Sequence, residues 1–423
     1  MRLLTRTRLI LLAAALATVA SAGLLSKDLP GSKPEDVGMS SERLARMDKL
    51  IHAYVDAGRT PGVVTLIARH GKVVHVDAYG KADLASGRAT RADDVFRMYS
   101  MTKPITSVAL LMQYEEGKFQ LTDPLSKFFP AFADVKVLNG MTPTGGMMLD
   151  SPRRPITIQD VFRHTAGFTY GFFGGSPVDK MYQEADVFGT DLNGLMTKLP
   201  KLPLLYQPGE QWVYSVAHDV QAALVEKLSG QKFDDYVRQR IFTPLGMADS
   251  MFKISADKKA RVPSLYSVGK DGKLAVDNNP LGGANYGDAV FGGYSISTTA
   301  ADYALFAQML LNKGQLNGVR LLSPKTVELM TTNHLPPAAL ASGAATLGPG
   351  TGYGLGVSVL MNPAQKGNVG SVGEFGWSGA ASTHVLIDPK EDLVAVYCTQ
   401  LMGGDFAVRA EFATLLYQSI VGN

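Results

Sequence analysis

A serine followed three positions later by a lysine is the pattern in this sequence with the clearest chemical potential. On a helix, residues three apart lie on one face, so the lysine amine can sit beside the serine hydroxyl and activate it as a nucleophile. The pattern begins at Ser100, Ser229, Ser250, Ser255 and Ser267. The spacing alone therefore does not identify a nucleophile, and the surrounding sequence has to select among these serines.

Ser100 has the context that a nucleophile requires. It follows a strand-like run at 95–98 and opens an apolar helical segment at 105–112, whereas the other four lie in loops or directly before a helix-ending glycine. Pro104 fits a helix only in its first turn, which places the helix start near Ser100. Backbone N–H groups and the helix dipole at that end favour a developing anion. We predict Ser100 as the nucleophile, with a simple N-cap role as the alternative.

Three short motifs then occur in order along the chain: Ser100-Met101-Thr102-Lys103, Tyr214-Ser215-Val216 and Trp377-Ser378-Gly379. With them, the sequence resembles the class C β-lactamase-like serine hydrolases, and within that superfamily most resembles the family VIII carboxylesterases. Further landmarks of the superfamily occur in order at 121–124, 156–158, 164–167, 208–210, 244–247 and 292–295. Each motif is weak by itself, and their common order makes the resemblance specific.

The resemblance implies an acyl-enzyme mechanism without metal or cofactor. Ser100 would attack a small carboxylic ester, and Lys103 with Tyr214 would form the base pair that takes its proton. Which of these two groups holds the proton at rest stays open, because their titrations are coupled. The resemblance also implies an oxyanion hole made by the backbone N–H groups of Ser100 and Ala380, with Gly379 allowing close approach of the backbone to the substrate.

Two departures from the class C β-lactamases bear on the substrate. Val216 stands where those enzymes have Asn, and Trp377 stands where they have Lys. A β-lactam brings an amide and a carboxylate that would lose polar partners here, which a neutral ester would not. We therefore expect an esterase, with a β-lactamase or D-alanyl-D-alanine carboxypeptidase as the alternative. An acylated penicillin- or peptidoglycan-binding sensor is the alternative of another class.

The substrate-binding residues are expected at the third motif and in an aromatic, glycine-rich loop at 167–175. These candidates are Trp377, Ser378, Gly379, Phe168, Tyr170, Phe172 and Phe173. The aromatic loop could equally pack into the core. We predict that His164 is structural and that Cys398 is a buried strand residue. For His384, a place in a strand at the edge of the site and a plain structural place both remain open.

The elements that must position these residues follow from periodicity and turn signals. Helices are expected at 41–58, 100–117, 216–228, 233–242, 299–312, from 323, and at 406–420, with strands at 63–68, 73–76, 354–360, 383–387 and 393–399. Residues 139–156 and 166–210 are expected to form long loops. The fold class is α/β (α+β), an antiparallel sheet flanked by helices as in the β-lactamase and penicillin-binding-protein fold. Residues 23–130 and 285–423 would form one α/β domain, and 131–284 an inserted, mainly helical one.

Composition limits the compartment and the partners. Three arginines in the first eight residues precede an apolar stretch at 9–20 and an Ala-x-Ala site ending at Ala22, which is typical of a cleaved signal peptide, with an uncleaved anchor as the alternative. Without residues 1–22 the basic and acidic residues are equal in number, so the net charge of +3 is no sign of nucleic-acid binding. We expect a periplasmic or secreted enzyme with no stable membrane anchor after cleavage. Its oligomeric state stays open.

Sequence patterns also exclude several classes of site. The single cysteine, Cys398, excludes an internal disulfide and any multi-cysteine zinc or iron–sulfur site. The chain has no G-x-S-x-G nucleophile elbow, no P-loop and no H-E-x-x-H zinc motif. The serine and lysine at 100 and 103 are therefore the strongest chemical signal in the chain.

Overall fold

The computed structural model describes residues 29–278, 290–404 and 406–422. The predicted signal peptide, 1–22, lies outside them. Within the described residues no helix combines the length and the apolar character needed to cross a membrane.

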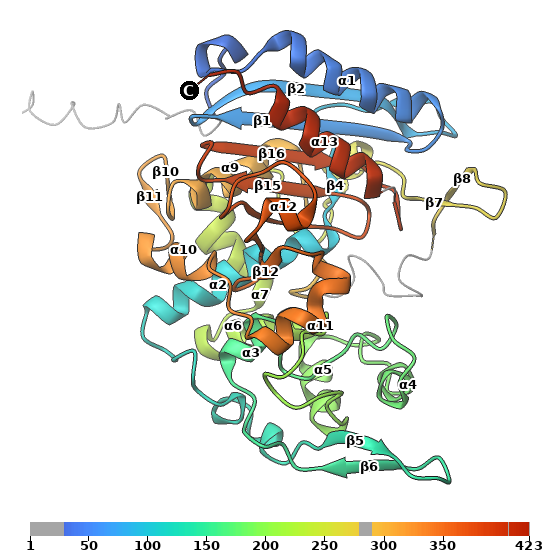
Figure 1. The fold of residues 1–423 in the computed structure, drawn as a ribbon, viewed down its shortest axis with the longest axis vertical. Helices are drawn as coiled ribbons and strands as arrows, with labels where there is room; N and C mark the ends of the chain where they lie inside the picture. The colour runs from blue at the N-terminus through green and yellow to red at the C-terminus, as the bar shows by residue number, and fades with distance from the viewer. Residues whose placement is uncertain (1–28, 279–289, 405, 423) are drawn as a thin grey trace, which may run out of the picture.

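An antiparallel sheet is assembled from the two ends of the chain (Figure 1). Its order is β12-β13-β14-β15-β16-β1-β2-β3, so the strand near the N-terminus lies beside the last strand. Their register places Val64 opposite Cys398. The bounds are β1 Gly62–Arg69, β2 Lys72–Asp83, β3 Arg88–Ala89, β12 Thr351–Tyr353, β13 Ser358–Leu360, β14 Phe375–Ser378, β15 His384–Asp388 and β16 Leu393–Cys398.

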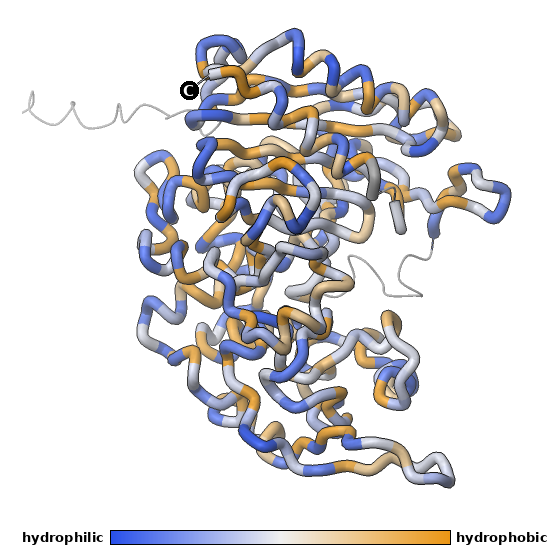
Figure 2. The backbone as a smooth tube through the Cα atoms, in the orientation of Figure 1, coloured by the Kyte–Doolittle hydropathy of each residue, from blue (hydrophilic) through white to orange (hydrophobic). Residues whose placement is uncertain are grey.

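Helices cover both faces of this sheet, which explains why every residue of β1 is buried. Helices α1 (Ser41–Asp56) and α13 (Phe406–Gln418) lie on one face, and α9 (Ala300–Leu311) lies on the other (Figure 1). Alternate strand residues divide accordingly: Ile67 belongs to the apolar cluster under α1, and Leu66 to the larger cluster on the opposite side. Hydrophobic and hydrophilic residues alternate along α1 in Figure 2, as expected for a helix on the surface of a sheet.

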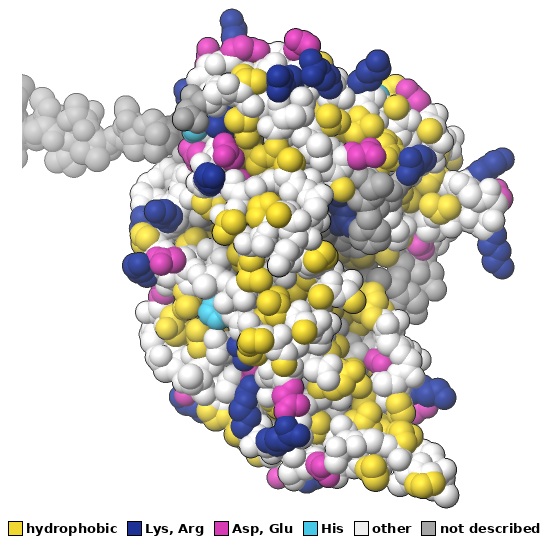
Figure 3. All heavy atoms as spheres, viewed as in Figure 1, with side chains coloured by type: hydrophobic (Ala, Val, Ile, Leu, Met, Phe, Trp, Pro, Cys, Tyr) yellow, Lys and Arg dark blue, Asp and Glu magenta, His cyan; other side chains and the backbone are white. Residues whose placement is uncertain are grey.

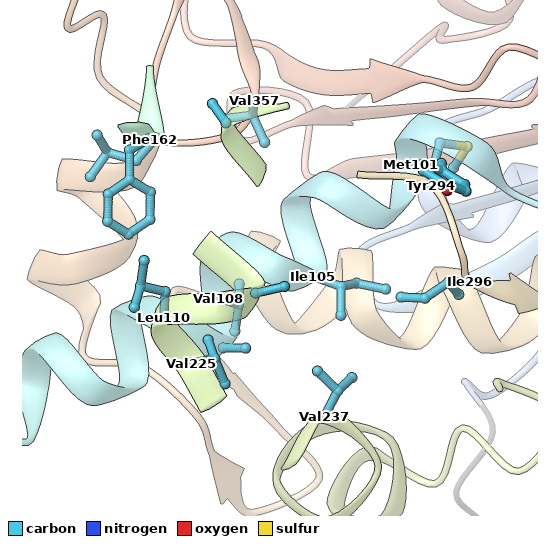
Figure 4. Packing of buried hydrophobic residues seen from close by; sticks show 14 of the residues in the cluster. Met101, Ile105, Val108, Leu110, Phe162, Val225, Val237, Tyr294, Ile296 and Val357 are labelled. Carbon is cyan, nitrogen blue, oxygen red and sulfur yellow. The ribbon is translucent and has the colours of Figure 1, made fainter. Parts of the chain in front are cut away.

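Helix α2 (Thr102–Glu115) runs through the centre of the larger cluster. It packs on α6 (Ala217–Ser229), and twelve of its residues are buried. A helix that is apolar on all sides must be enclosed by other elements. Figure 4 shows one such contact, with Ile105 of α2 and Ile296 pointing toward each other. The start of α2 is thereby fixed inside the molecule, together with Lys103 in its first turn and Ser100 in the 3₁₀ turn directly before it.

The remaining elements are short. They are β4 Phe96–Arg97 paired with β9 Ser297–Thr298, β5 Val137–Met141 with β6 Met147–Asp150, β7 Tyr266–Val268 with β8 Leu274–Val276, β10 Gln315–Leu316 with β11 Val319–Arg320, and helices α3 Ile158–Phe162, α4 Pro177–Glu184, α5 Leu192–Lys198, α7 Phe233–Val237, α8 Thr243–Leu245, α10 Pro324–Met330, α11 Pro337–Leu347 and α12 Pro363–Lys366.

The expectation of long loops at 139–156 and 166–210 was wrong. Strands β5 and β6 form a hairpin there, and α4 and α5 are helices. Local caps explain α4: Ser176 and Asp179 form a capping box, and Pro177 occupies the first helical position. These elements are too short to show a periodic apolar pattern, so the glycines around them dominated the sequence signal.

The proposed boundaries of the inserted region, 131 and 284, stay a prediction, and position 284 lies outside the described residues. The larger buried cluster contains residues of the sheet and of the helical region alike. In Figure 3, charged side chains crowd the end of the molecule around α1. Hydrophobic side chains reach the surface at the β5–β6 hairpin, where Met141, Met148 and Leu149 are exposed.

Candidate active site

A strained turn presents Ser100 at the start of α2. Strand β4 leads into a 3₁₀ turn, Tyr99–Met101, and α2 begins at the next residue. Tyr99 has a φ of +46°, a left-handed conformation that an aromatic residue adopts at a cost of about 1–3 kcal/mol. No side-chain cap stabilises either helical start, so the structure does not support the N-cap alternative for Ser100. Pro104 lies in the first turn of α2, as predicted.

The amine of Lys103 lies within hydrogen-bonding distance of three oxygen atoms. Its Nζ is 3.2 Å from Ser100 Oγ, 2.9 Å from the hydroxyl of Tyr170 and 2.9 Å from the carbonyl oxygen of Gly293. The Lys103 side chain is fully buried. A buried amine needs such partners, because burial without them would be strongly unfavourable. The serine and lysine of the first motif are thus in contact, as the helical spacing predicts.

Tyr214 lies beside the same amine but presents its ring face. Nζ of Lys103 is 4.5 Å from the centre of the Tyr214 ring, a cation–π distance. The Tyr214 hydroxyl accepts a hydrogen bond of 3.3 Å from the indole Nε1 of Trp377. The structure therefore brings all three motifs together. The hydroxyl bonded to Lys103 belongs to Tyr170, however, which the sequence assigned only to the pocket wall.

Close packing of the backbone positions the third motif against the nucleophile. Thr383 Oγ1 donates to the carbonyl oxygen of Met98, two residues before Ser100. A Cβ atom at Gly379 would lie 2.2 Å from that same carbonyl oxygen and 2.2 Å from Thr383 Oγ1, so only glycine fits. The N–H of the next residue, Ala380, has no protein acceptor among the described residues. It is therefore free to act as an oxyanion donor.

Gly379→Ala is expected to lower kcat/KM for an ester by about 10²–10³-fold, the effect of losing one oxyanion donor. The added methyl group must displace the backbone that carries the Ala380 N–H. Steady-state kinetics with p-nitrophenyl butyrate would measure the loss. Gly31→Ala is the matched control, because a Cβ there meets nothing closer than 4.0 Å. Equal kinetics of the two variants would contradict this role of Gly379.

The aromatic loop divides between the site and the core. Tyr170 stacks on Phe172 at 5.2 Å between ring centres and contacts Tyr214 at 5.3 Å. Phe172 and Phe173 are 41% and 65% exposed, so they are able to contact a substrate. Phe168 is buried instead, with its ring against Phe132 in the core. Of the two roles expected for this loop, core packing therefore applies to Phe168, and a place at the site is open to Phe172 and Phe173.

Buried ionisable groups surround the lysine, and one of them, Asp219, was not predicted from the sequence. Asp219 is fully buried in the first turn of α6, and its Oδ1 accepts a 2.7 Å hydrogen bond from the N–H of Gly293. Burial raises the pKa of the Asp219 carboxyl to about 7, against the opposing effect of the Lys103 charge. Asp219 lies five positions after Tyr214 in the sequence, in the first turn of α6. Nothing in the sequence distinguishes it from an ordinary acidic residue in a first helical turn.

The other residues singled out in the sequence have structural contacts. His164 Nδ1 lies 3.1 Å from Ser215 Oγ, and burial followed by the Lys103 charge lowers the pKa of His164 well below its usual value. Nδ1 of His384 lies 2.8 Å from Ser378 Oγ, its cross-strand neighbour. Burial raises the pKa of the Cys398 thiol, as expected of an unreactive strand residue. No group of three or more His, Cys, Asp or Glu side chains suited to a metal occurs among the described residues.

Comparison with known proteins agrees with this arrangement. Residues 47–418 match the β-lactamase family. The chain belongs to the β-lactamase family. A lovastatin esterase from Penicillium rubens is 31% identical over 379 residues, covering 84% of this chain and 92% of its own length. Esterase EstB from Burkholderia gladioli is 28% identical over 361 residues, covering 81% and 87%.

A solved structure confirms the fold of this β-lactamase-family member. EstCE1, described as a hydrolase with promiscuous acyltransferase activity, superimposes with a TM-score of 0.75 over 89% of this chain and 99% of its own, at 24% identity. The fold class predicted from the sequence, an antiparallel sheet flanked by helices, is confirmed. The chain is thus a serine hydrolase of the β-lactamase type.

Proposed function

We propose that this β-lactamase-family enzyme is a carboxylesterase that cleaves small neutral esters through an acyl-enzyme on Ser100. The observation that carries the proposal is the contact between Ser100 Oγ and the buried amine of Lys103, with Tyr214 against the same amine. Two curated relatives that are named esterases support the choice of substrate class. The strained turn before Ser100 is typical of a residue held for function.

The reaction follows from these positions. Lys103 and Tyr214 act together as the base, so Ser100 Oγ loses its proton as it attacks the ester carbonyl carbon. The carbonyl oxygen becomes an anion that the N–H groups of Ser100 and Ala380 stabilise. A proton returned to the leaving alcohol completes acylation, and water activated by the same pair hydrolyses the acyl-enzyme. No metal or cofactor enters this scheme.

The second and third motifs favour neutral substrates. Trp377 places an indole beside Tyr214 where a β-lactamase has a lysine for the substrate carboxylate. Val216 is fully buried in the larger apolar cluster and offers no polar atom to a lactam amide. The exposed aromatic rings at Phe172 and Phe173 suit a short to medium acyl or alcohol group.

The test compares p-nitrophenyl acetate, butyrate and palmitate with a chromogenic cephalosporin. Each unmatched polar group of a β-lactam costs about 1–3 kcal/mol, more when it is charged. We expect kcat/KM for the butyrate ester to exceed that for the cephalosporin by about 10²–10⁴-fold, and the palmitate ester to be a poor substrate. Equal kcat/KM values for the cephalosporin and the butyrate ester would contradict the esterase proposal and indicate a β-lactamase.

Export is part of the proposal. The basic N-terminus, the apolar stretch at 9–20 and the Ala-x-Ala site ending at Ala22 support a periplasmic or secreted enzyme. N-terminal sequencing of the mature protein, expected to begin at Gly23, would test the predicted cleavage.

A further inference from the structure

The surroundings of Lys103 determine where its proton-accepting lone pair points. To accept a proton from Ser100, the Lys103 amine must be in its neutral form, which has two N–H groups and one lone pair. The carbonyl oxygen of Gly293, 2.9 Å away, can only accept, so it takes one N–H. When the Tyr170 oxygen, also at 2.9 Å, takes the second, the lone pair is left facing Ser100 Oγ. Tyr170 and Gly293 together therefore orient the amine.

Asp219 is a buried carboxyl that the reaction scheme above does not use. Its Oδ1 accepts the Gly293 N–H, and its Oδ2 is buried without a hydrogen-bond partner among the described residues. A half-satisfied buried carboxyl is unfavourable for stability, so its presence requires an explanation. Gly293 thus accepts from Lys103 through its carbonyl and donates to Asp219 through its N–H.

Gly293 is the point at which these groups converge. A Cβ atom placed on it would lie 3.0 Å from the Tyr170 hydroxyl, 3.0 Å from Asp219 Oδ1 and 3.1 Å from Asp219 Oδ2. Such contacts are tighter than ordinary packing, so a larger residue would push the tyrosine and the aspartate apart. The lysine, the tyrosine and the aspartate therefore form one compact buried unit around a glycine.

We propose that Tyr170 and Asp219 are positioning residues for Lys103, with Tyr170 aiming the amine at Ser100 and Asp219 stabilising the ammonium that forms during acylation. In that step the Ser100 O–H bond breaks and an N–H bond forms on Lys103. Oγ bonds to the ester carbon, and the carbonyl π electrons move onto its oxygen. When Asp219 is ionised, its negative charge near the newly formed buried cation lowers the barrier. The inference rests on the proposed function, because it requires Ser100 as the nucleophile.

The pH dependence of this unit involves all the titratable groups packed around Lys103. They are Tyr170, Tyr214, His164, His218 and Asp219, with Tyr294 and Tyr353 beside Tyr170. Burial lowers the pKa of His164 and of His218 well below the usual value, so both imidazoles are neutral at pH 7. Burial, followed by the nearby Tyr214 and Asp219, raises the pKa of Tyr170, which keeps its proton. Asp219 is therefore the neighbour that changes charge near neutral pH.

The test uses Asp219→Asn, Tyr170→Phe and the control Tyr182→Phe in the full-length mature enzyme. Asparagine keeps an oxygen for the Gly293 N–H but removes the charge. Tyr182 is buried like Tyr170 and packs against the same loop at Gly171, but no hydrogen bond joins it to Lys103 or Asp219. The readouts are kcat and KM for p-nitrophenyl butyrate across pH, and the rate at which a fluorophosphonate labels Ser100.

We expect Asp219→Asn to lower kcat by about 10²-fold with little change in KM, in the range of general acid–base effects. The acid limb of its pH–rate profile should move to lower pH, because the variant loses a carboxyl whose pKa is raised to about 7. Tyr170→Phe should lower kcat and the labelling rate by about 10-fold or more. The acid limb of its pH–rate profile should stay at the same pH as in the wild type. Tyr182→Phe should behave as the wild type.

If Asp219→Asn and Tyr170→Phe both show the pH profile and the labelling rate of the wild-type enzyme, the proposal is wrong. A loss that appears only as a higher KM, equal at every pH, would also overturn it, because that result indicates a structural role. If Asp219→Asn does not fold by near-ultraviolet circular dichroism, Tyr170→Phe decides alone. A wild-type enzyme that is not labelled at Ser100 would refute the proposed function itself. Normal labelling of Ser100 in every variant would refute only this inference.

Discussion

Ser100→Ala abolishes ester hydrolysis, with an expected loss in kcat of at least about 10⁴-fold. The variant lacks the hydroxyl that we propose as the nucleophile, while Lys103 keeps its hydrogen bonds to Tyr170 and Gly293. Because the Ser100 hydroxyl caps neither helical start, the free energy of unfolding should change by only about 0.5 kcal/mol. Hydrolysis of p-nitrophenyl butyrate and thermal unfolding would measure the two effects.

Ser229→Ala is the matched control for this experiment. Ser229 also has a lysine three positions later, but it ends α6 and its hydroxyl donates to the carbonyl oxygen of Val225. The control variant should retain full activity and full labelling by a fluorophosphonate. Labelling at Ser229 instead of Ser100, or residual wild-type turnover in Ser100→Ala, would contradict the assignment.

The second large effect is expected at the base. Lys103→Ala and Tyr214→Phe should each lower kcat by about 10²–10⁴-fold, as expected for loss of a general base. The double variant should lose little more than the worse single variant, because the two side chains act on one proton and are in direct contact.

A double-mutant cycle on kcat for p-nitrophenyl butyrate measures this coupling. The product of the two single losses, found in the double variant, would show that the residues act independently. Lys103→Ala also removes the cation that acts on Asp219 in the described part of the chain, so the thermal stability of this variant should be measured beside its kinetics. Tyr214→Phe removes one hydroxyl, whose structural contact is the hydrogen bond from the Trp377 N–H, and so provides the structurally milder comparison.

The first motif could be predicted from the sequence because its signals are local. A proline permitted only in the first helical turn, followed by an apolar segment, locates the start of α2 and hence Ser100 and Lys103. That Tyr214 and Trp377 lie close to Ser100 and Lys103 could be predicted only from the family resemblance. Nothing local relates residues so far apart along the chain.

The contact between Tyr170 and Lys103 could not be predicted in the same way. It depends on the path of the loop after α3, where Gly167 and Gly171 adopt φ values of +85° and +84°. Glycine permits these angles without encoding the direction that the chain takes. Asp219 was missed for a related reason, since an acidic residue early in a helix usually interacts with the helix dipole. Only tertiary packing shows that this carboxyl is buried.

Pairing between β1 and β16 has a consequence for how the molecule folds. Val64 and Cys398 are paired between β1 and β16, so a growing chain cannot complete that sheet until residue 398 has been made. Until then one edge of the apolar strand β1 is unpaired, which makes the chain prone to aggregation. Folding is also slow, because the missing strand is distant in sequence. Folding must therefore be completed late, and the start of α2, with Lys103, gains its final surroundings only when β14, β15 and β16 dock.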